Sequence, residues 1–151
     1  MVDVSAKRRP SKARDELADD AWQLMAGFFF EIGMRHMSES RQATGLNPGA
    51  IKALQSLDPD QPRTMGSLAD AWHCDASNVT WLVDRLEERG LVERRTLPTD
   101  RRVKTVVLTD SGKALRKDVD AIWAKAPEQF RSLDRDTLST LIEVMRKLRP
   151  S

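Results

Sequence analysis

Residues 75–109 decide the fold, and they read DASNVTWLVDRLEERGLVERRTLPTDRRVKTVVLT. Four apolar residues of the first half recur at the i, i+3, i+4, i+7 spacing of a helix with one buried side: Val79, Leu82, Val83 and Leu86. Asp75 suits the N-cap of this helix, and Gly90 suits a left-handed stop at its end. The first half therefore predicts a one-sided helix.

The second half predicts a basic hairpin. Turn-forming residues from Pro98 to Arg102 separate two runs of strand-forming residues. Five basic residues of this hairpin stand against the two acids Glu93 and Asp100; they are Arg94, Arg95, Arg101, Arg102 and Lys104. An arginine on such a turn can enter the narrow minor groove of DNA, where the negative potential is strongest. The alternative is a charged hairpin that only faces solvent.

Two short helices are expected upstream of this stretch. Asn47 and Pro48 suit the cap and first position of one helix, whose buried edge is Ile51, Leu54 and Leu57. A very short strand at Thr64–Met65 and a short helix at residues 66–72 follow. The turn of residues 73–75 then completes a helix-turn-helix pattern. A polar-faced helix beside a basic hairpin is the arrangement by which a winged helix meets DNA.

The polar side of the central helix carries groups that can read bases. Ser77, Asn78 and Thr80 lie in its first turns, which in a recognition helix usually approach base edges. Arg85 is placed for a phosphate or guanine contact. Trp81 is costly to leave in water, so it either packs on a sugar or a thymine methyl group or is shielded by the hairpin.

The outer parts of the chain predict helices that need a partner. Residues 15–38 form a helix that is apolar on most sides, with a polar connection at Ser40–Gly45. Its aromatic cluster fits a packed core or dimer contact, or a pocket for a planar ligand. Thr109 or Asp110 caps a long helix that breaks at Pro127, and Asp134 begins the last helix. We expect the same helices of a second subunit to cover these apolar stripes.

The composition of the chain narrows the class of protein further. The 151 residues carry a net charge of only +2, so clustering of charge matters more than its sum. The single cysteine, Cys74, excludes an internal disulfide framework and a cysteine-based zinc cluster; it is a small buried filler or, less favoured, a redox switch. No apolar run is long enough for a membrane span, and no secretory signal precedes the domain, so we expect a cytoplasmic protein. His36 is expected to be solvated or capping.

The motifs of residues 46–115 resemble the winged-helix core of the MarR family of bacterial transcription regulators. The matching pieces are Leu46-Asn47-Pro48-Gly49, Leu68-Ala69, Val79-Thr80, Leu82-Val83-Asp84-Arg85-Leu86-Glu87, Arg89-Gly90-Leu91-Val92-Glu93-Arg94, Asp100-Arg101-Arg102 and Leu108-Thr109. The order of helices around this core is also similar. Trp81 departs from the family pattern, which more often has a small or basic residue there. The first helix also lacks the cysteine of the peroxide-sensing members.

The resemblance implies a mainly α fold with a small β-hairpin wing. The basic composition of residues 1–14 indicates a flexible arm. Beyond it, the resemblance implies an N-terminal dimerisation helix and connection (15–45), a winged helix-turn-helix domain (46–109) and C-terminal dimerisation helices (110–151). It implies a homodimer on a near-palindromic operator in double-stranded DNA, with helix 76–89 in the major groove. Arg102 would reach the minor groove, with Asp84 pairing to it and Asp100 also positioning the wing.

Many members are repressors that a small, often aromatic, anionic ligand releases from DNA. Here no motif identifies an effector or its binding residues, and neither a metal nor a cofactor is expected. The alternative function is a winged-helix module for protein association. An enzyme is the least favoured class, because the two histidines and one cysteine form no recognisable triad or metal-ligand spacing.

Overall fold

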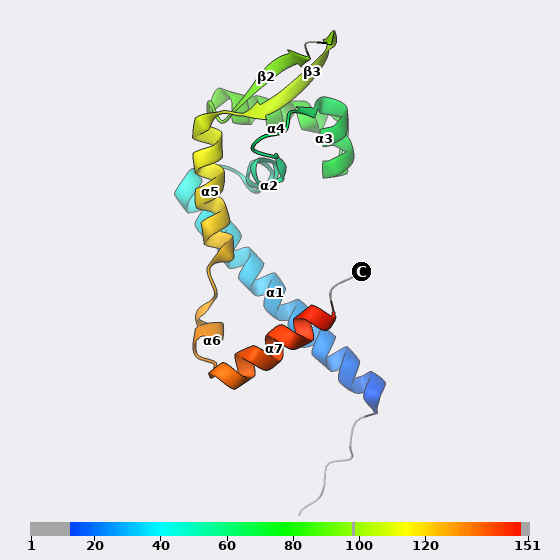
Figure 1. The fold of residues 1–151 in the computed structure, drawn as a ribbon, viewed down its shortest axis with the longest axis vertical. Coiled ribbons are helices and arrows are strands. Elements are labelled where there is room, and N and C mark those ends of the chain that lie inside the picture. The colour runs from blue at the N-terminus through cyan, green and yellow to red at the C-terminus, as the bar shows by residue number, and fades with distance from the viewer. Residues whose placement is uncertain (1–12, 98, 149–151) are drawn as a thin grey trace, which may run out of the picture. The chain divides into compact units, whose positions relative to one another are not determined.

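The computed structural model describes residues 13–97 and 99–148, apart from the side chain of Arg101 (Figure 1). Residues 1–12 of the predicted basic arm, and Pro98 in the predicted turn, lie outside this part of the chain. The elements in order are α1 (Arg14–Thr44), α2 (Pro48–Ser56), β1 (Arg63–Thr64), α3 (Met65–Trp72), α4 (Ala76–Glu88), β2 (Val92–Leu97), β3 (Asp100–Leu108), α5 (Asp110–Ala124), α6 (Glu128–Arg131) and α7 (Arg135–Lys147). The predicted mainly helical fold with a β-hairpin wing is confirmed.

The chain divides into two compact units, with the boundary between Arg35 and His36. The described part of the first unit is the N-terminal portion of α1. Several of its large apolar side chains are exposed: Leu17, Trp22, Leu24, Phe29, Phe30 and Met34. So many exposed large apolar side chains on one helix are unusual for a chain that works alone.

The core of the second unit is built by the helices and the sheet that surround α4. Every one of the four apolar residues expected on the inner side of α4 is buried. The predicted buried edge of α2 is also confirmed, since Ile51, Leu54 and Leu57 are at most 1% exposed. Burying a side chain of this size contributes roughly 1.5–3 kcal/mol. The inner side of α4 is thus fixed by packing, and its outer side is left free.

Side-chain caps set the starts of five helices. The predicted caps Asn47 and Asp75 each accept a hydrogen bond from a backbone N–H in the first turn of their helix. Thr109, rather than the alternative Asp110, does so for α5, and Asp134, the expected start of the last helix, does so for α7. Thr64 does the same for α3, which the sequence reading had not assigned. Such caps satisfy donors that the first turn of a helix leaves unpaired. The helix starts are therefore local properties of the sequence.

The sheet has the strand order β1-β3-β2, and both pairings are antiparallel. The very short strand expected at Thr64–Met65 is present one residue earlier, at Arg63–Thr64. β2 and β3 form the hairpin, which we call the wing, and an irregularity in their register lies between Thr96 and Leu97. The wing begins directly after α4, because Gly90 takes the left-handed conformation (φ 67°) that was predicted for it.

The polar connection predicted at Ser40–Gly45 was wrong, because α1 continues through it to Thr44. Ser40 and Thr44 are buried, and the hydroxyl of Thr44 donates to the carbonyl of Ser40 at 2.7 Å. The backbone N–H of Leu46 in turn donates to the Thr44 hydroxyl at 3.1 Å. Polar side chains that are satisfied within the helix do not interrupt it. The helix ends at Gly45, whose φ is 66°.

Two further features differ from the predictions made from sequence. His36 is buried rather than solvated or capping, and its ring meets the ring of Trp123 edge-on at 5.6 Å. The indole N–H of Trp123 also donates to Ser40 at 3.2 Å, so this histidine is part of the packing between the end of α1 and α5. The short helix α6 was not predicted, because four residues are too few to show a helical period.

α5 approaches the backbone between α4 and β2 very closely at Gly112. The backbone N–H of Thr109 donates to the carbonyl of Leu91 at 3.1 Å, and the Thr109 hydroxyl donates to the carbonyl of Gly90 at 2.6 Å. A Cβ placed on Gly112 would lie 1.9 Å from the Leu91 carbonyl oxygen. Only glycine therefore fits where α5 leaves the sheet.

Candidate nucleic-acid interface

The outer side of α4 gathers the predicted base-reading side chains. Ser77, Asn78, Thr80, Trp81 and Arg85 are all exposed. They lie opposite the buried stripe, so packing of the core leaves them facing solvent. Within the part of the chain that the structure describes, these residues form one polar surface on a rigid helix.

Asp75 organises the start of this surface. Its carboxylate accepts a hydrogen bond from the Ser77 hydroxyl at 2.7 Å and from the Asn78 backbone N–H at 2.8 Å. The hydroxyl of Ser77 and the backbone N–H of Asn78 together lower the pKa of Asp75 below its ordinary value. The ionised form of Asp75 therefore stabilises the first turn of α4.

This cap predicts a specific pH dependence. Because the folded pKa lies below the unfolded one, the stabilisation is complete above the ordinary aspartate pKa, about 4, and is lost as the pH falls through the lowered value. Asp75→Asn keeps a capping oxygen but removes the titration. We expect the stability difference between wild type and Asp75→Asn, measured by urea unfolding, to shrink as the pH falls from 7 to 3. A constant difference would contradict this cap's role.

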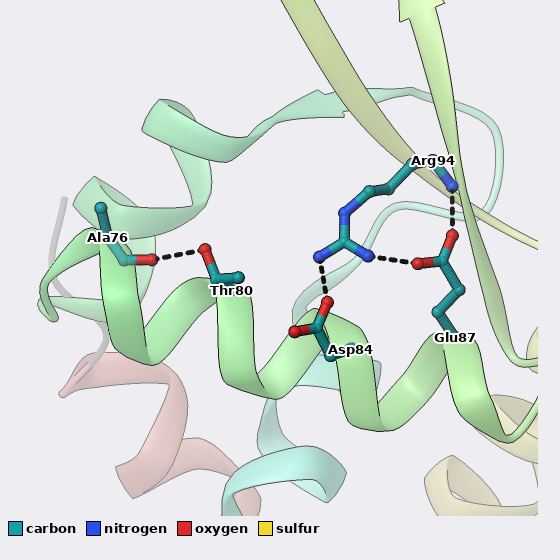
Figure 2. A network of polar contacts seen from close by, with 5 residues as sticks. All are labelled: Ala76, Thr80, Asp84, Glu87 and Arg94. Atoms are coloured by element: carbon teal, nitrogen blue, oxygen red, sulfur yellow. Dashed lines mark hydrogen bonds and ion pairs between the residues drawn. The ribbon is translucent and has the colours of Figure 1, made fainter.

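Further along α4, Trp81 and Arg85 form a pair. The guanidinium carbon of Arg85 lies 5.6 Å from the centre of the Trp81 ring, and Arg85 Nη1 lies 3.1 Å from a carboxylate oxygen of Glu88. Trp81 is 47% exposed, so the wing does not shield it. Thr80 has its hydroxyl turned back onto the carbonyl of Ala76 at 2.8 Å (Figure 2).

Arg94, in β2, joins the wing to α4. Figure 2 shows its guanidinium between Asp84 and Glu87, with Nη2 donating to Asp84 Oδ1 at 2.5 Å and Nη1 donating to Glu87. Its backbone N–H donates to the other Glu87 oxygen at 3.1 Å. Burial alone would lower the pKa of Arg94, but the hydrogen bonds to Asp84 and Glu87 outweigh it and raise the pKa. We call these three residues the wing clamp.

The wing clamp corrects the expected partner of Asp84, which is Arg94 rather than Arg102. Arg94 lies near the base of the wing, paired in register with Val106, whereas Arg102 lies beside the tip. The base of the wing is the part that adjoins α4. The sequence did not lead us to predict Glu87 as a member of this cluster. Its position three residues after Asp84 could have indicated it, because this spacing puts the two carboxylates side by side on one helix face.

At the wing tip, the Asp100 carboxylate accepts a hydrogen bond from the backbone N–H of Arg102 at 2.9 Å, which fixes the turn. The side chain of Arg102 is exposed. Arg95 is also exposed and pairs with Glu93 on the same strand. The side chain of Arg101 lies outside the described residues. Three wing arginines thus have different surroundings: Arg94 is clamped, Arg95 is paired along its strand, and Arg102 faces solvent at the tip.

A shallow hollow of about 430 Å³ lies beside the wing, between the loop of residues 58–62 and the start of α5. Its charged lining comprises Asp58, Asp60, Glu93, Asp110, Arg95 and Lys113. Because four acidic side chains stand against two basic ones, the hollow does not suit an anionic ligand. Among the described residues, no cluster of histidine, cysteine and carboxylate side chains could hold a metal ion. None of the helices within residues 13–97 and 99–148 has the length and apolar character of a membrane span.

Comparisons with known proteins agree with this geometry. The family model of the MarR family matches residues 46–104, which contain α2 to most of the wing. YcgE of Bacillus subtilis, an HTH-type transcriptional regulator, is 36% identical over 129 residues, covering 83% of this chain and 75% of the relative. MhqR of Bacillus subtilis, also an HTH-type transcriptional regulator, is 31% identical over 114 residues, covering 75% of this chain and 79% of MhqR.

The chain belongs to the MarR family. The crystal structure of YusO from Bacillus subtilis has a TM-score of 0.71 at 27% identity, covering 91% of this chain and 97% of YusO. YcgE and MhqR are named as transcription regulators rather than enzymes, in agreement with the prediction from sequence. The resemblance stated from the motifs is thereby confirmed, and the fold of the outer helices is also shared, since the YusO match extends well beyond the residues of the family model.

Proposed function

We propose that this protein is a sequence-specific transcription regulator that binds double-stranded DNA as a homodimer. The observation that carries the proposal is the outer side of α4, where exposed polar side chains stand beside a basic wing that is clamped to the same helix. α4 would enter the major groove, which is about 12 Å wide and admits a helix. The tip of the wing would enter the adjacent minor groove.

Each site residue then has a role. Ser77, Asn78, Thr80, Trp81 and Arg85 would contact bases or phosphates from α4. Arg102, together with Arg101, would contact the minor groove. Arg94 is better explained as a positioning residue than as a DNA contact, because its guanidinium is already held by Asp84 and Glu87. Asp100 would shape the turn that presents Arg102.

The direct test is a gel shift on the promoter beside the protein's own gene, followed by selection from genomic fragments. We expect a specific complex whose affinity falls steeply with salt, because several phosphate contacts release counterions. Failure of both assays to find any preferred site would contradict the proposal. Association with a protein partner that shows no such salt dependence would instead favour a protein-association module.

The homodimer is a separate prediction. The first unit exposes several large apolar and aromatic side chains. In the last helix, α7 exposes Ile142, Val144 and Met145, and its C-cap residue Leu148 is also exposed. Covering them in a second copy would remove this surface from water. We expect sedimentation at micromolar concentration to give twice the monomer mass. A stable monomer would contradict this part of the proposal and would leave single-site DNA binding to be tested on its own.

We also propose that the protein is a repressor that a small aromatic anion can release. MdtR of Bacillus subtilis, 33% identical over 101 residues, is named a repressor. Those of the aromatic side chains Trp22, Phe29 and Phe30 that the second copy leaves uncovered could contact a planar ligand. The acidic hollow beside the wing is unsuited to an anion. A panel of aromatic carboxylates that leaves the operator complex intact would contradict this release mechanism.

A further inference from the structure

The exposed pair of Trp81 and Arg85 lies outside the buried core cluster. Both side chains lie on the outer side of α4, away from the buried stripe. Leaving an indole 47% exposed costs hydrophobic free energy that a core position would recover. Exposed large apolar groups of this kind often mark a contact surface.

The two side chains are held together before any partner is present. They lie one helical turn apart, and the Arg85 guanidinium sits 5.6 Å from the centre of the Trp81 ring, within reach of a cation–π contact. Arg85 is also held by an ion pair with Glu88, with Nη1 lying 3.1 Å from a carboxylate oxygen. A guanidinium has further N–H groups, so this ion pair does not prevent a bidentate contact. Less side-chain freedom is then lost on binding.

The chemistry of each side chain selects a base. In the major groove, the thymine methyl is the apolar feature that an indole can cover, while arginine most often contacts the O6 and N7 atoms of guanine. The 5.6 Å from the Arg85 guanidinium carbon to the centre of the Trp81 ring lies between one and two base-pair steps of about 3.4 Å. The two groups are therefore close enough to contact neighbouring base pairs.

We propose that Trp81 and Arg85 act as one specificity-determining unit that reads a thymine next to a guanine in each half of the operator. This inference rests on the proposed DNA-binding function and deepens it. Trp81 would cover the thymine methyl, and Arg85, stacked against the indole, would contact the neighbouring guanine. Ser77 and Asn78, nearer the start of α4, would act on other positions of the same half-site.

The test compares the base preferences of matched variants by selection from random duplexes. Trp81→Ala should lose the thymine preference, and Trp81→Phe should retain much of it, because phenylalanine keeps an apolar ring. Arg85→Lys keeps the positive charge but loses the planar guanidinium that makes a bidentate contact. It should therefore keep the salt dependence of binding and lose the guanine preference. Each loss should be about tenfold in relative affinity and confined to its own position.

Chemical changes to the operator provide an independent measurement. Replacing the selected thymine with deoxyuridine removes only the methyl group, and 7-deazaguanine removes only the N7 acceptor. We expect each to weaken wild-type binding and to leave the corresponding variant unaffected. If the wild type selects a clear site but Trp81→Ala and Arg85→Lys select the same one, this inference fails while the proposed function stands. If the wild type selects no site, both fail.

Discussion

Replacing Gly112 with alanine should destabilise the second unit by about 3 kcal/mol or more, the upper range for overpacking in a core. The added Cβ would lie 1.9 Å from the Leu91 carbonyl oxygen and 3.1 Å from a methyl carbon of Leu108. The Leu91 carbonyl cannot move freely, because it also accepts the hydrogen bond from the Thr109 backbone N–H. Thermal unfolding followed by circular dichroism should show a fall in Tm on the order of 10 °C.

The matched control is Gly66→Ala. Gly66 lies in α3, and a Cβ there would meet nothing within 4 Å. Glycine to alanine in a helix normally stabilises by roughly 0.5–1 kcal/mol, so the two substitutions should change stability in opposite directions. If Gly112→Ala proved as stable as wild type, α5 would have to sit farther from the α4–β2 connection than it does in this structure.

Replacing Arg102 with alanine should weaken operator binding by about 1–3 kcal/mol, which is roughly 5- to 150-fold. In the proposed complex this side chain enters the minor groove, where the negative potential favours arginine. The substitution should hardly change stability, because Arg102 is exposed and donates to Asp100 through its backbone N–H, which alanine keeps. Binding would be measured by titration at several salt concentrations.

Arg95→Ala is the control for charge. It removes the same charge from the same wing, but the Arg95 guanidinium pairs with Glu93 along β2. We expect Arg95→Ala to reduce operator affinity much less than Arg102→Ala does. Equal losses in the two variants would indicate that the wing acts only through its total charge, and a minor-groove role for Arg102 would have to be abandoned.

The wing clamp shows where sequence reasoning reached its limit. The sequence placed an acid, Asp84, on the helix that faces DNA, and the family resemblance suggested a wing arginine as its partner. Four arginines of the wing were comparable candidates by chemistry alone. The antiparallel register puts Arg94 near the base of the wing, so Asp84 and Glu87 hold Arg94 and leave Arg102 exposed at the tip.

Local features were predictable because they depend on residues three or four positions apart. The caps at Asn47, Asp75, Thr109 and Asp134, and the left-handed Gly90, all form within one turn of their own helix or connection. The buried stripe of α4 follows from the 3.6-residue period in the same way. These features, together with the motifs that resemble the MarR family, were sufficient to predict the winged-helix fold from sequence.

The sequence by itself therefore determined the helices other than α6, although not the full length of α1. It also determined which side of α4 is buried and which polar groups α4 presents. Only the tertiary structure decided that Arg94 is the partner of Asp84 and that Gly112 must be a glycine. The physical reason is that helix formation is governed by short-range periodicity and capping. The partner of a charged side chain, and the room available for a Cβ, depend instead on strand register, on how closely two backbones approach and on which side-chain rotamers pack together.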